Sequence, residues 1–199
     1  MDIGGGKLNL LLGSAYSWHE VDTDRQATIG TNVQALSASY SASTAQLFTE
    51  LGYAMPLSRT AHIEPYAGVA WSDTRTRGFG ETGGSAALHS SGDRNTLTMT
   101  TVGLRAGTRF QLGNVEGTVH AGAGWRHAFG DVLPATTLAF AGGQTFTVTG
   151  APIARNAGLA ELRADLALSR AATFSVRYAG QFGDGNRDHT ASAGLRWRF

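Results

Sequence analysis

Apolar and polar side chains alternate strictly at the end of the chain, which reads TASAGLRWRF. Ala, Leu, Trp and Phe occupy every second position up to Phe199, and Thr, Ser, Gly and Arg occupy the positions between them. Side chains in a β-strand point alternately to the two faces of a sheet, so this pattern predicts a strand with one apolar face and one basic face.

Seven earlier segments show the same alternation, so the sequence predicts eight strands in all. They are residues 7–18, 44–55, 62–71, 101–112, 115–129, 160–168 and 172–182. Each is long enough to cross a bilayer as a tilted strand, which takes about 9–11 residues. The charged residues of these strands all fall on the face opposite the large apolar ones: Glu50, Glu64, Arg105, Arg109, Glu116, Arg126, Glu161, Arg163, Asp165, Arg177, Arg196 and Arg198.

Two architectures explain this segregation. In a soluble sandwich or lipocalin-like barrel, the apolar face points into a dry core and the charges meet solvent. In an outer-membrane barrel, the apolar face contacts lipid and the charges line a polar lumen. Alternation alone does not distinguish the two.

The positions of the aromatic residues favour the membrane barrel. If consecutive strands run up and down, aromatic side chains on the apolar face gather at both ends of the strands. Trp18, Trp71, Trp125 and Phe182 lie at one end, and Tyr53, Phe110, Phe174, Trp197 and Phe199 lie at the other. Amphipathic rings settle at the headgroup level of a bilayer, so two such girdles match its two interfaces.

The lengths of the predicted links agree with this interpretation. Residues 55–61, 111–114 and 168–172 form short links at what we call the turn end of the strands. Residues 20–35, 73–96 and 130–157 form long links at the opposite end, here the loop end, with a shorter one at 183–188. Short periplasmic turns that alternate with long external loops are typical of outer-membrane barrels.

Composition adds a few bounds. Twenty-seven glycines and four prolines disfavour long helices, and the lack of cysteine excludes disulfides and cysteine-ligated zinc. The net charge of +1 gives no indication of a nucleic-acid partner. The sequence contains no run of 18 apolar residues, so it predicts no transmembrane helix, and residues 1–10 lack the features of a signal peptide. If the protein works outside the cytosol, we therefore expect its export signal to have been removed or to lie upstream.

No catalytic chemistry is indicated. The six histidines form no HxxxH or HExxH spacing, and no GxSxG motif occurs. We therefore assign no catalytic residues, no metal ligands and no cofactor. Eight glycines share the polar face: Gly13, Gly52, Gly68, Gly103, Gly107, Gly122, Gly124 and Gly194. They either leave room for a polypeptide in the lumen or relieve crowding where a small barrel bends.

An ordered series of motifs resembles the C-terminal β-domain of autotransporters. From residue 62 onward it comprises HIEPYAGVAW, GFGETGG, TTVGLRAGTRF, GWRHAFGD, TLAFAGGQTFTVTGAPIARNAG, RYAGQFGDGNRDH and SAGLRWRF, and AYSWHEVDTDR and TAQLFTELGY resemble the segments that precede them. The resemblance implies an all-β, antiparallel, up-and-down transmembrane barrel. It further implies 12 strands in the outer membrane of a Gram-negative bacterium and export of an N-terminal passenger by type V secretion.

Against that family pattern, the chain provides eight strands, which resemble the last eight. We therefore expect residues 1–6 to be a short leader and 7–199 to be an N-terminally incomplete barrel domain. We expect a non-enzymatic translocator and anchor whose passenger is covalently linked upstream. A self-contained small barrel that acts as an adhesin or structural anchor through its loops is the main alternative, and a soluble ligand-binding barrel is the third.

The resemblance also gives the chain terminus a role. In outer-membrane proteins, the barrel-assembly machinery reads a terminal strand with a glycine and two aromatic residues, which are here Gly194, Trp197 and Phe199. Such a strand can add to the edge of another sheet through its backbone, with alternate side chains providing specificity. The same two aromatics also serve as anchors at the membrane interface.

Overall fold

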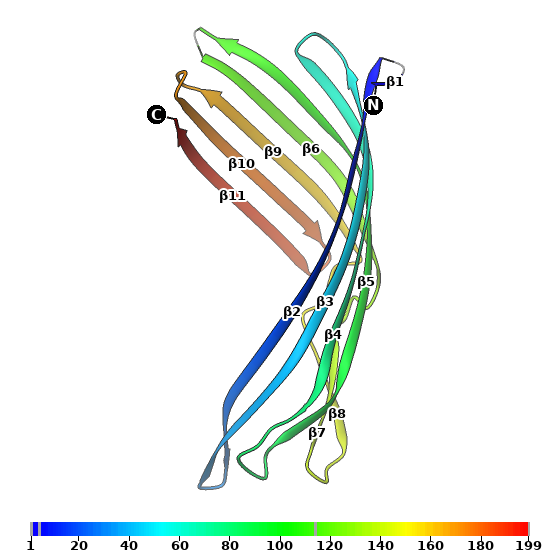
Figure 1. Ribbon diagram of the computed structural model, residues 1–199, viewed down its shortest axis with the longest axis vertical. Helices are drawn as coiled ribbons and strands as arrows, with labels where there is room; N and C mark the ends of the chain where they lie inside the picture. The colour runs from blue at the N-terminus through cyan, green and yellow to red at the C-terminus, as the bar shows by residue number, and fades with distance from the viewer. Residues whose placement is uncertain (1, 4, 114, 199) are drawn as a thin grey trace.

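The computed structural model describes residues 2–3, 5–113 and 115–198, and these form one antiparallel sheet (Figure 1). Within the described residues the sheet has eleven strands. Nine follow the order β1-β2-β3-β4-β5-β6-β9-β10-β11, and off this path β7 pairs with β5 and β8 pairs with β7. The strands are β1 (Asp2–Ile3), β2 (Gly6–Ile29), β3 (Asn32–Pro56), β4 (Ala61–Gly80), β5 (Leu88–Leu112), β6 (Val115–Gly130), β7 (Ala135–Phe140), β8 (Thr145–Thr149), β9 (Asn156–Ala167), β10 (Ala172–Gly183) and β11 (Asn186–Trp197).

Eight of these strands contain the eight segments predicted from alternation. They are β2 to β6 and β9 to β11, and each pairs with its neighbours along the chain in antiparallel register. The predicted all-β, antiparallel, up-and-down fold is therefore confirmed. Over the part of the chain that the structure describes, no helix is long and apolar enough to cross a membrane.

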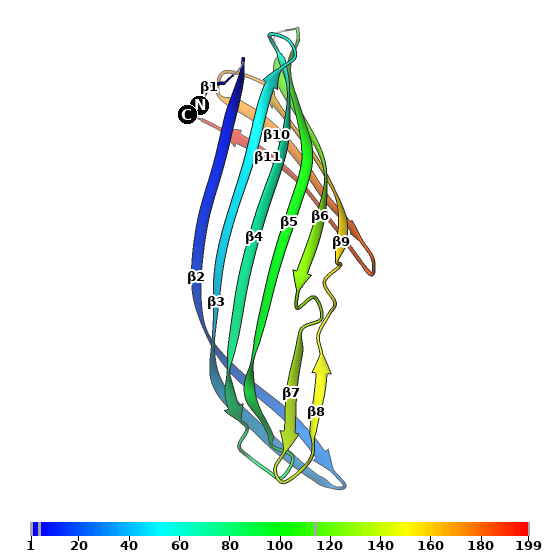
Figure 2. The ribbon, with the colours of Figure 1, turned by 90° about the vertical axis from the view of Figure 1, so that its right-hand side faces the viewer.

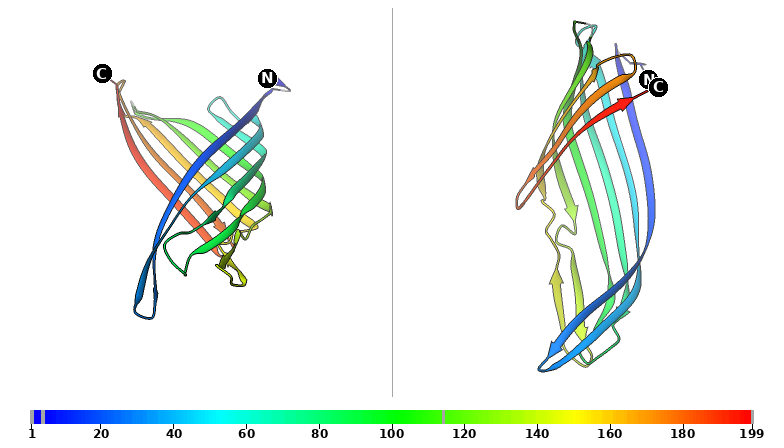
Figure 3. Two further views of the ribbon diagram at one scale, coloured as in Figure 1. Left: turned by 60° about the horizontal axis from the view of Figure 1, so that its bottom comes forward. Right: turned by 90° about the vertical axis from the view of Figure 1, so that its left-hand side faces the viewer.

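The sheet curls into a half-barrel that stays open along one side (Figures 2 and 3). One border is β11, which pairs only with β10, and the other is β2, whose far edge meets only the two-residue β1 among the described strands. Both chain ends lie at the turn end, at the top of Figure 1. The strands twist and curl together because L-residues favour a right-handed strand twist.

Two turns at the turn end have the same pattern of serine hydrogen bonds. In LSRTA, the Ser58 hydroxyl accepts hydrogen bonds from the amides of Thr60 and Ala61, at 3.2 and 3.0 Å. In LSRAA, the Ser169 hydroxyl accepts from the amides of Ala171 and Ala172, also at 3.2 and 3.0 Å. A serine hydroxyl that bonds the backbone two or three residues on stabilises a tight reversal. These two short links are thus confirmed as tight turns, and the third, 111–114, includes residue 114, which lies outside the described residues.

The long links predicted at the loop end are present, but much of their length belongs to strands. Residues 20–35 continue β2 and β3 as an unbroken hairpin, and residues 73–96 contain the ends of β4 and β5. Residues 130–157 contain β7 and β8, and the 183–188 link reduces to a two-residue turn between β10 and β11. In residues 20–35 and 73–96 polar side chains predominate on both faces, so the apolar alternation that identifies a strand is absent there although the backbone pairing persists.

The segment between β4 and β5 folds onto the extended β2–β3 hairpin. Ser37 and Thr82 exchange two backbone hydrogen bonds, at 3.0 and 2.9 Å. Leu36, Ala86 and Ala87 are buried together in a small apolar cluster. Gly83 has a φ of +111°, and a Cβ there would lie 1.9 Å from the Ala35 carbonyl oxygen, so only glycine fits this approach.

An ion pair holds the same segment. The guanidinium of Arg25 donates to both carboxylate oxygens of Glu81, at 2.7 and 2.6 Å, and also to the carbonyl oxygen of Ala86 at 2.6 Å. The Glu81 side chain also accepts from the amide of Leu88 at 2.8 Å. These hydrogen bonds lower the pKa of Glu81, with the contribution of Arg25 the largest. We call residues 81–87 the latch segment.

Candidate functional site

The continuous register of the sheet brings the charged residues of the eight strands to one face. Strand pairing places Glu64 opposite Arg105, Arg105 opposite Gly122 and Gly122 opposite Glu161. Alternation within each strand then assigns all ten predicted lumen residues to the same face, here the charged face: Glu50, Glu64, Arg105, Arg109, Arg126, Glu161, Arg163, Asp165, Arg177 and Arg196. That this face lines a lumen is taken up below as a proposal.

A cluster around Arg105 spans three strands of the charged face. The guanidinium of Arg105 on β5 lies 3.7 Å from the centroid of the Tyr66 ring on β4. It crosses this ring to reach Glu50 on β3, where two hydrogen bonds of 2.5 and 2.9 Å form a bidentate pair. Glu64 lies 3.9 Å from the same guanidinium, so one cation faces two carboxylates. Bidentate geometry and a cation–π contact hold the Arg105 side chain in a fixed position.

Glycines provide the space in which this cluster lies. A Cβ on Gly103 would lie 2.6 Å from the Tyr66 ring, and a Cβ on Gly124 would lie 2.8 Å from its hydroxyl oxygen. The Glu64 side chain covers Gly52 in the same way. Room for a polypeptide and relief of curvature were the two functions expected of these glycines. At Gly52, Gly103 and Gly124 the space is taken by side chains of neighbouring strands, and both expected functions stay predictions.

A second polar group lies on β9 and β10. Asp165 accepts hydrogen bonds from Arg163 and from the hydroxyl of Ser175, both at 2.6 Å. Arg163 and Arg177 are direct cross-strand partners on the charged face. A cavity of about 620 Å³ opens beside them, lined among others by Glu161 and by His62 and His120, whose rings are 6.0 Å apart. This part of the charged face therefore carries charges of both signs.

Several charged groups of this face keep donor or acceptor capacity for a ligand. Glu161, Arg109 and Arg177 form no direct ion pair with any residue that the structure describes. The Nε of Arg126 is buried and has no hydrogen-bond partner among the described atoms. The same part of the chain contains no group of three or more His, Cys, Asp or Glu residues arranged to hold a metal ion. The face is therefore suited to contact polar chains.

The opposite face carries the predicted aromatic girdles and is apolar. The register assigns Trp18, Trp71, Trp125 and Phe182 to it at the loop end, and Tyr53, Phe110, Phe174 and Trp197 at the turn end. Between them, large aliphatic side chains of this face are close to half exposed or more, including Leu10, Leu12, Leu47, Leu51, Val69, Val102, Leu104, Leu162, Val176 and Leu195. A soluble monomer rarely exposes a continuous apolar surface of this extent.

The terminal strand β11 forms the border of the sheet, and its side chains alternate between the charged and the apolar face. Gly194 lies on the charged face, opposite Ser175, and Trp197 lies on the apolar face with 64% of its surface exposed. A Cβ on Gly194 would meet no atom within 4 Å. Phe199, the third residue of the predicted assembly signal, lies outside the described residues.

Sequence reasoning missed two charged clusters at the loop end. One is the Arg25–Glu81 pair. The other joins Asp73 to Arg75 and Arg94, at positions that strand alternation assigns to the apolar face. All five residues lie in stretches that were interpreted as links, where no strand parity was assigned. The available signal was the excess of Arg, Asp and Glu in those stretches, which does not by itself indicate pairing.

A curled antiparallel sheet with one charged and one apolar face is the class of structure found in transmembrane β-barrels. Comparison with known proteins identifies the family. The family model "Autotransporter beta-domain" matches residues 3–179. Two proteins named "Extracellular serine protease" from Serratia marcescens are 33% and 34% identical to the chain over 195 residues.

The chain belongs to the autotransporter β-domain family. The aligned region covers 98% of this chain and 19% of each Serratia protein, so the chain spans about a fifth of the length of those relatives. The resemblance inferred from the motifs is thereby confirmed. The membership favours the membrane-barrel interpretation of the two-faced sheet over the soluble one.

Proposed function

We propose that this domain is a translocator and anchor in the outer membrane of a Gram-negative bacterium, and that it exports an N-terminally linked passenger to the cell surface. The observation that carries the proposal is the separation of the two faces over all eight long strands. An apolar band between two aromatic girdles is suited to lipid, and the charged face is suited to a water-filled passage.

The charged face offers a polypeptide a hydrated surface with few strong binding points. Arg105 is already neutralised by Glu50 and Glu64, and Asp165 is occupied by Arg163 and Ser175. At these two points the paired charges hold water and leave little net attraction for either sign of charge. A chain in transit would therefore move along the face without being trapped.

The open border of the half-barrel requires partners in lipid. Unpaired backbone groups are strongly unfavourable in the hydrocarbon region, so membrane strands must form a closed barrel. We propose that strands outside this sheet pair with the free edges of β2 and β11 and complete the 12-stranded barrel of the family. The barrel-assembly machinery and the lipid bilayer are the partners that this proposal requires.

The Serratia relatives are named as serine proteases, but the aligned region is a fifth of their length. We propose that the domain itself contributes no catalysis and that any such activity belongs to a linked passenger. The identity of that passenger follows from the sequence joined to the N-terminal side of this domain.

The test uses a complete autotransporter whose β-domain carries this sequence as its last strands, with an epitope in the passenger. We expect the epitope to be labelled by antibody on intact cells and the domain to migrate as a heat-modifiable band from the outer-membrane fraction. Insertion of the barrel without surface exposure of the epitope would instead support the self-contained anchor or adhesin. The projecting β2–β3 hairpin gives that alternative its physical basis.

A further inference from the structure

A groove lies on the apolar-face side of the sheet immediately beyond the loop-end girdle. Its floor is formed by the small side chains of Ser41, Ser43 and Ala45 on β3. Tyr16 and Trp18 on β2 form one wall, and the other wall on β4 consists of Trp71, Asp73, Arg75 and Arg77. The groove has a volume of about 640 Å³. Small residues between two tall rows create this depression without any irregularity of the backbone.

Strand register determines which side chains are neighbours along and across the groove. Trp18, Ser43, Arg75 and Arg94 are successive cross-strand neighbours on β2, β3, β4 and β5. The row nearer the apolar band contains Tyr16, Ala45, Asp73 and Thr96. With increasing distance from the band, the β4 wall therefore changes from Trp71 through Asp73 to the basic Arg75 and Arg77, whereas the β2 wall is aromatic at both Tyr16 and Trp18.

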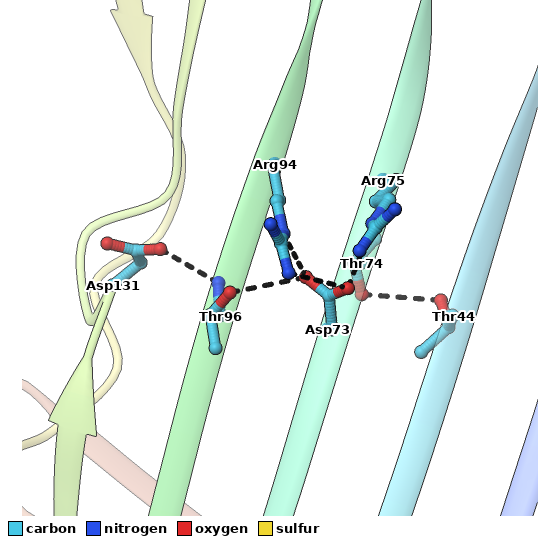
Figure 4. Close-up of polar contacts among 7 residues, drawn as sticks. All are labelled: Thr44, Asp73, Thr74, Arg75, Arg94, Thr96 and Asp131. Atoms are coloured by element: carbon cyan, nitrogen blue, oxygen red, sulfur yellow. Dashed lines mark hydrogen bonds and ion pairs between the residues drawn. The ribbon is translucent and has the colours of Figure 1, made fainter.

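Asp73 orients the arginines of this wall (Figure 4). Its carboxylate accepts from Nε of Arg94 at 2.6 Å, from Nε of Arg75 at 2.9 Å and from the hydroxyl of Thr96 at 3.2 Å. The Asp73 side chain is 5% exposed, whereas those of Arg75 and Arg94 are 60% and 58% exposed. Each guanidinium has five N–H donors, so donors of both remain directed to the outside.

The charge of the groove favours an anion. Arg75, Arg77 and Arg94 provide three positive charges, and Asp73 together with Glu20 on the opposite wall provides two negative charges. Guanidinium groups bind phosphate oxygens through paired hydrogen bonds, more specifically than an ammonium group does. The side chain of Trp18 remains 79% exposed and packs edge-to-face with Tyr16, with ring centroids 4.6 Å apart.

We propose that this groove binds the anionic, phosphate-bearing headgroup of a lipid of the outer leaflet. The inference rests on the proposed function, because it requires the apolar face to lie in the outer membrane. Trp18 and Trp71 then stand at the headgroup level, and the arginines stand where the phosphates of that leaflet lie. The aromatic walls contact the apolar part of the same molecule, which a free phosphate ion lacks.

The experiment uses a complete autotransporter that carries this domain, extracted from the outer membrane and stripped of bound lipid. The protein is reconstituted in vesicles of equal parts phosphatidylcholine and phosphatidylglycerol, re-extracted gently, and its retained lipids are counted by mass spectrometry. We expect phosphatidylglycerol to be enriched over the vesicle composition. Equal retention of the two lipids by the wild-type protein would overturn the proposal without any need for a variant.

Substitutions locate the site. Arg75→Gln and Arg94→Gln should each reduce the enrichment about three- to fivefold, the effect of losing one exposed charged contact. Arg187→Gln is the matched control, because Arg187 lies opposite Phe182 on the same face and loses the same charge outside the groove. An equal fall in all three variants would show general charge attraction and contradict a built site. Heat-modifiable migration verifies that each variant is folded.

Two further measurements distinguish a failure of the lipid site from a failure of the proposed function. When inorganic phosphate is titrated into the lipid-free protein, we expect no saturable binding at the groove. Saturable binding that is lost in Arg75→Gln would assign the groove to free phosphate instead of lipid. Absence of the protein from the outer-membrane fraction would refute both the proposed function and the lipid site. An inserted protein without lipid enrichment would refute the lipid site alone.

Discussion

The guanidinium of Arg105 lies over the ring of Tyr66 at 3.7 Å and reaches beyond it to the carboxylate of Glu50. Three consecutive strands, β3, β4 and β5, are thereby joined on the charged face by side chains in addition to their backbone ladders. The ring in turn lies over Gly103 and Gly124, so a charge, a ring and two glycines form one packed unit.

Neutralising the acidic partner should weaken this unit measurably. Glu50→Gln removes the charge from both hydrogen bonds of Arg105, and we expect a loss of roughly 1–2 kcal/mol in the free energy of unfolding. Glu116→Gln on the same face is the control, since Glu116 forms no ion pair with any described residue and should change stability by less than about 0.5 kcal/mol. Denaturant titration in detergent compares the two, and equal losses would contradict a special role for the Arg105 unit.

A methyl group on Gly103 should disturb the ring. The Cβ of Gly103→Ala would lie 2.6 Å from Tyr66, and the ring has little freedom because Arg105 covers its other face. Overpacking of this kind costs about 1–3 kcal/mol. Gly194→Ala, where the new Cβ meets no atom within 4 Å, should leave the unfolding free energy nearly unchanged. The reverse order of sensitivity in the same denaturant titration would rule out the packed arrangement.

The latch segment should loosen in acid. Hydrogen bonds from Arg25 lower the pKa of Glu81 in the folded state, so the contribution of this pair is full above the ordinary glutamate value of about 4.3. It is lost as the pH falls through the lowered pKa, when Glu81 becomes protonated. We expect amide hydrogen exchange at residues 81–87, corrected for its intrinsic pH dependence, to accelerate in that range.

Glu81→Gln provides the control for the latch. The variant lacks the titrating group, so its exchange in residues 81–87 should be faster than wild type at neutral pH and should no longer respond to acid. A wild-type protein with the same acid response as the variant would show that the Arg25–Glu81 pair does not govern the segment.

The final residue distinguishes an anchor from an assembly signal. Deletion of Phe199 should cut the amount of barrel inserted in cells if the assembly machinery reads the terminal aromatic, while refolding in detergent stays close to normal. As an anchor alone, Phe199 would contribute at most about 1.5–3 kcal/mol, and both assays would decline together. Leu195→Ala in the same strand is the control, because it trims the apolar face without altering the terminus.

The sequence predicts much of the fold because a continuous antiparallel register preserves the alternation of side chains from strand to strand. Arg105 and Glu50 are 55 residues apart, yet parity alone assigns them to one face. Parity does not predict that Arg105 crosses Tyr66 to reach Glu50, since that contact depends on strand tilt and on the space above Gly103.

The contacts at the loop end could not be predicted from the sequence, for a different reason. Beyond Trp18 and Trp71 polar side chains predominate on both faces of the strands, and hydrophobic periodicity no longer reports the backbone conformation. Arg25 and Glu81 meet because the latch segment folds back, and Asp73 meets Arg94 because β4 and β5 continue past the girdle. The local composition shows the excess of charged residues but does not indicate which of them pair.

The central claim is that one face of the sheet contacts lipid and the other lines a hydrated passage. The chain contains no cysteine, so a single cysteine introduced at Val102 or at Thr101 can be labelled with one environment-sensitive fluorophore. The labelled protein is a complete, otherwise cysteine-free autotransporter reconstituted in vesicles. These neighbours on β5 lie on opposite faces by register. We predict that nitroxide-labelled lipid quenches the label at Val102, whereas aqueous iodide quenches the label at Thr101. Equal quenching at both positions, or the reverse pattern, would contradict the account.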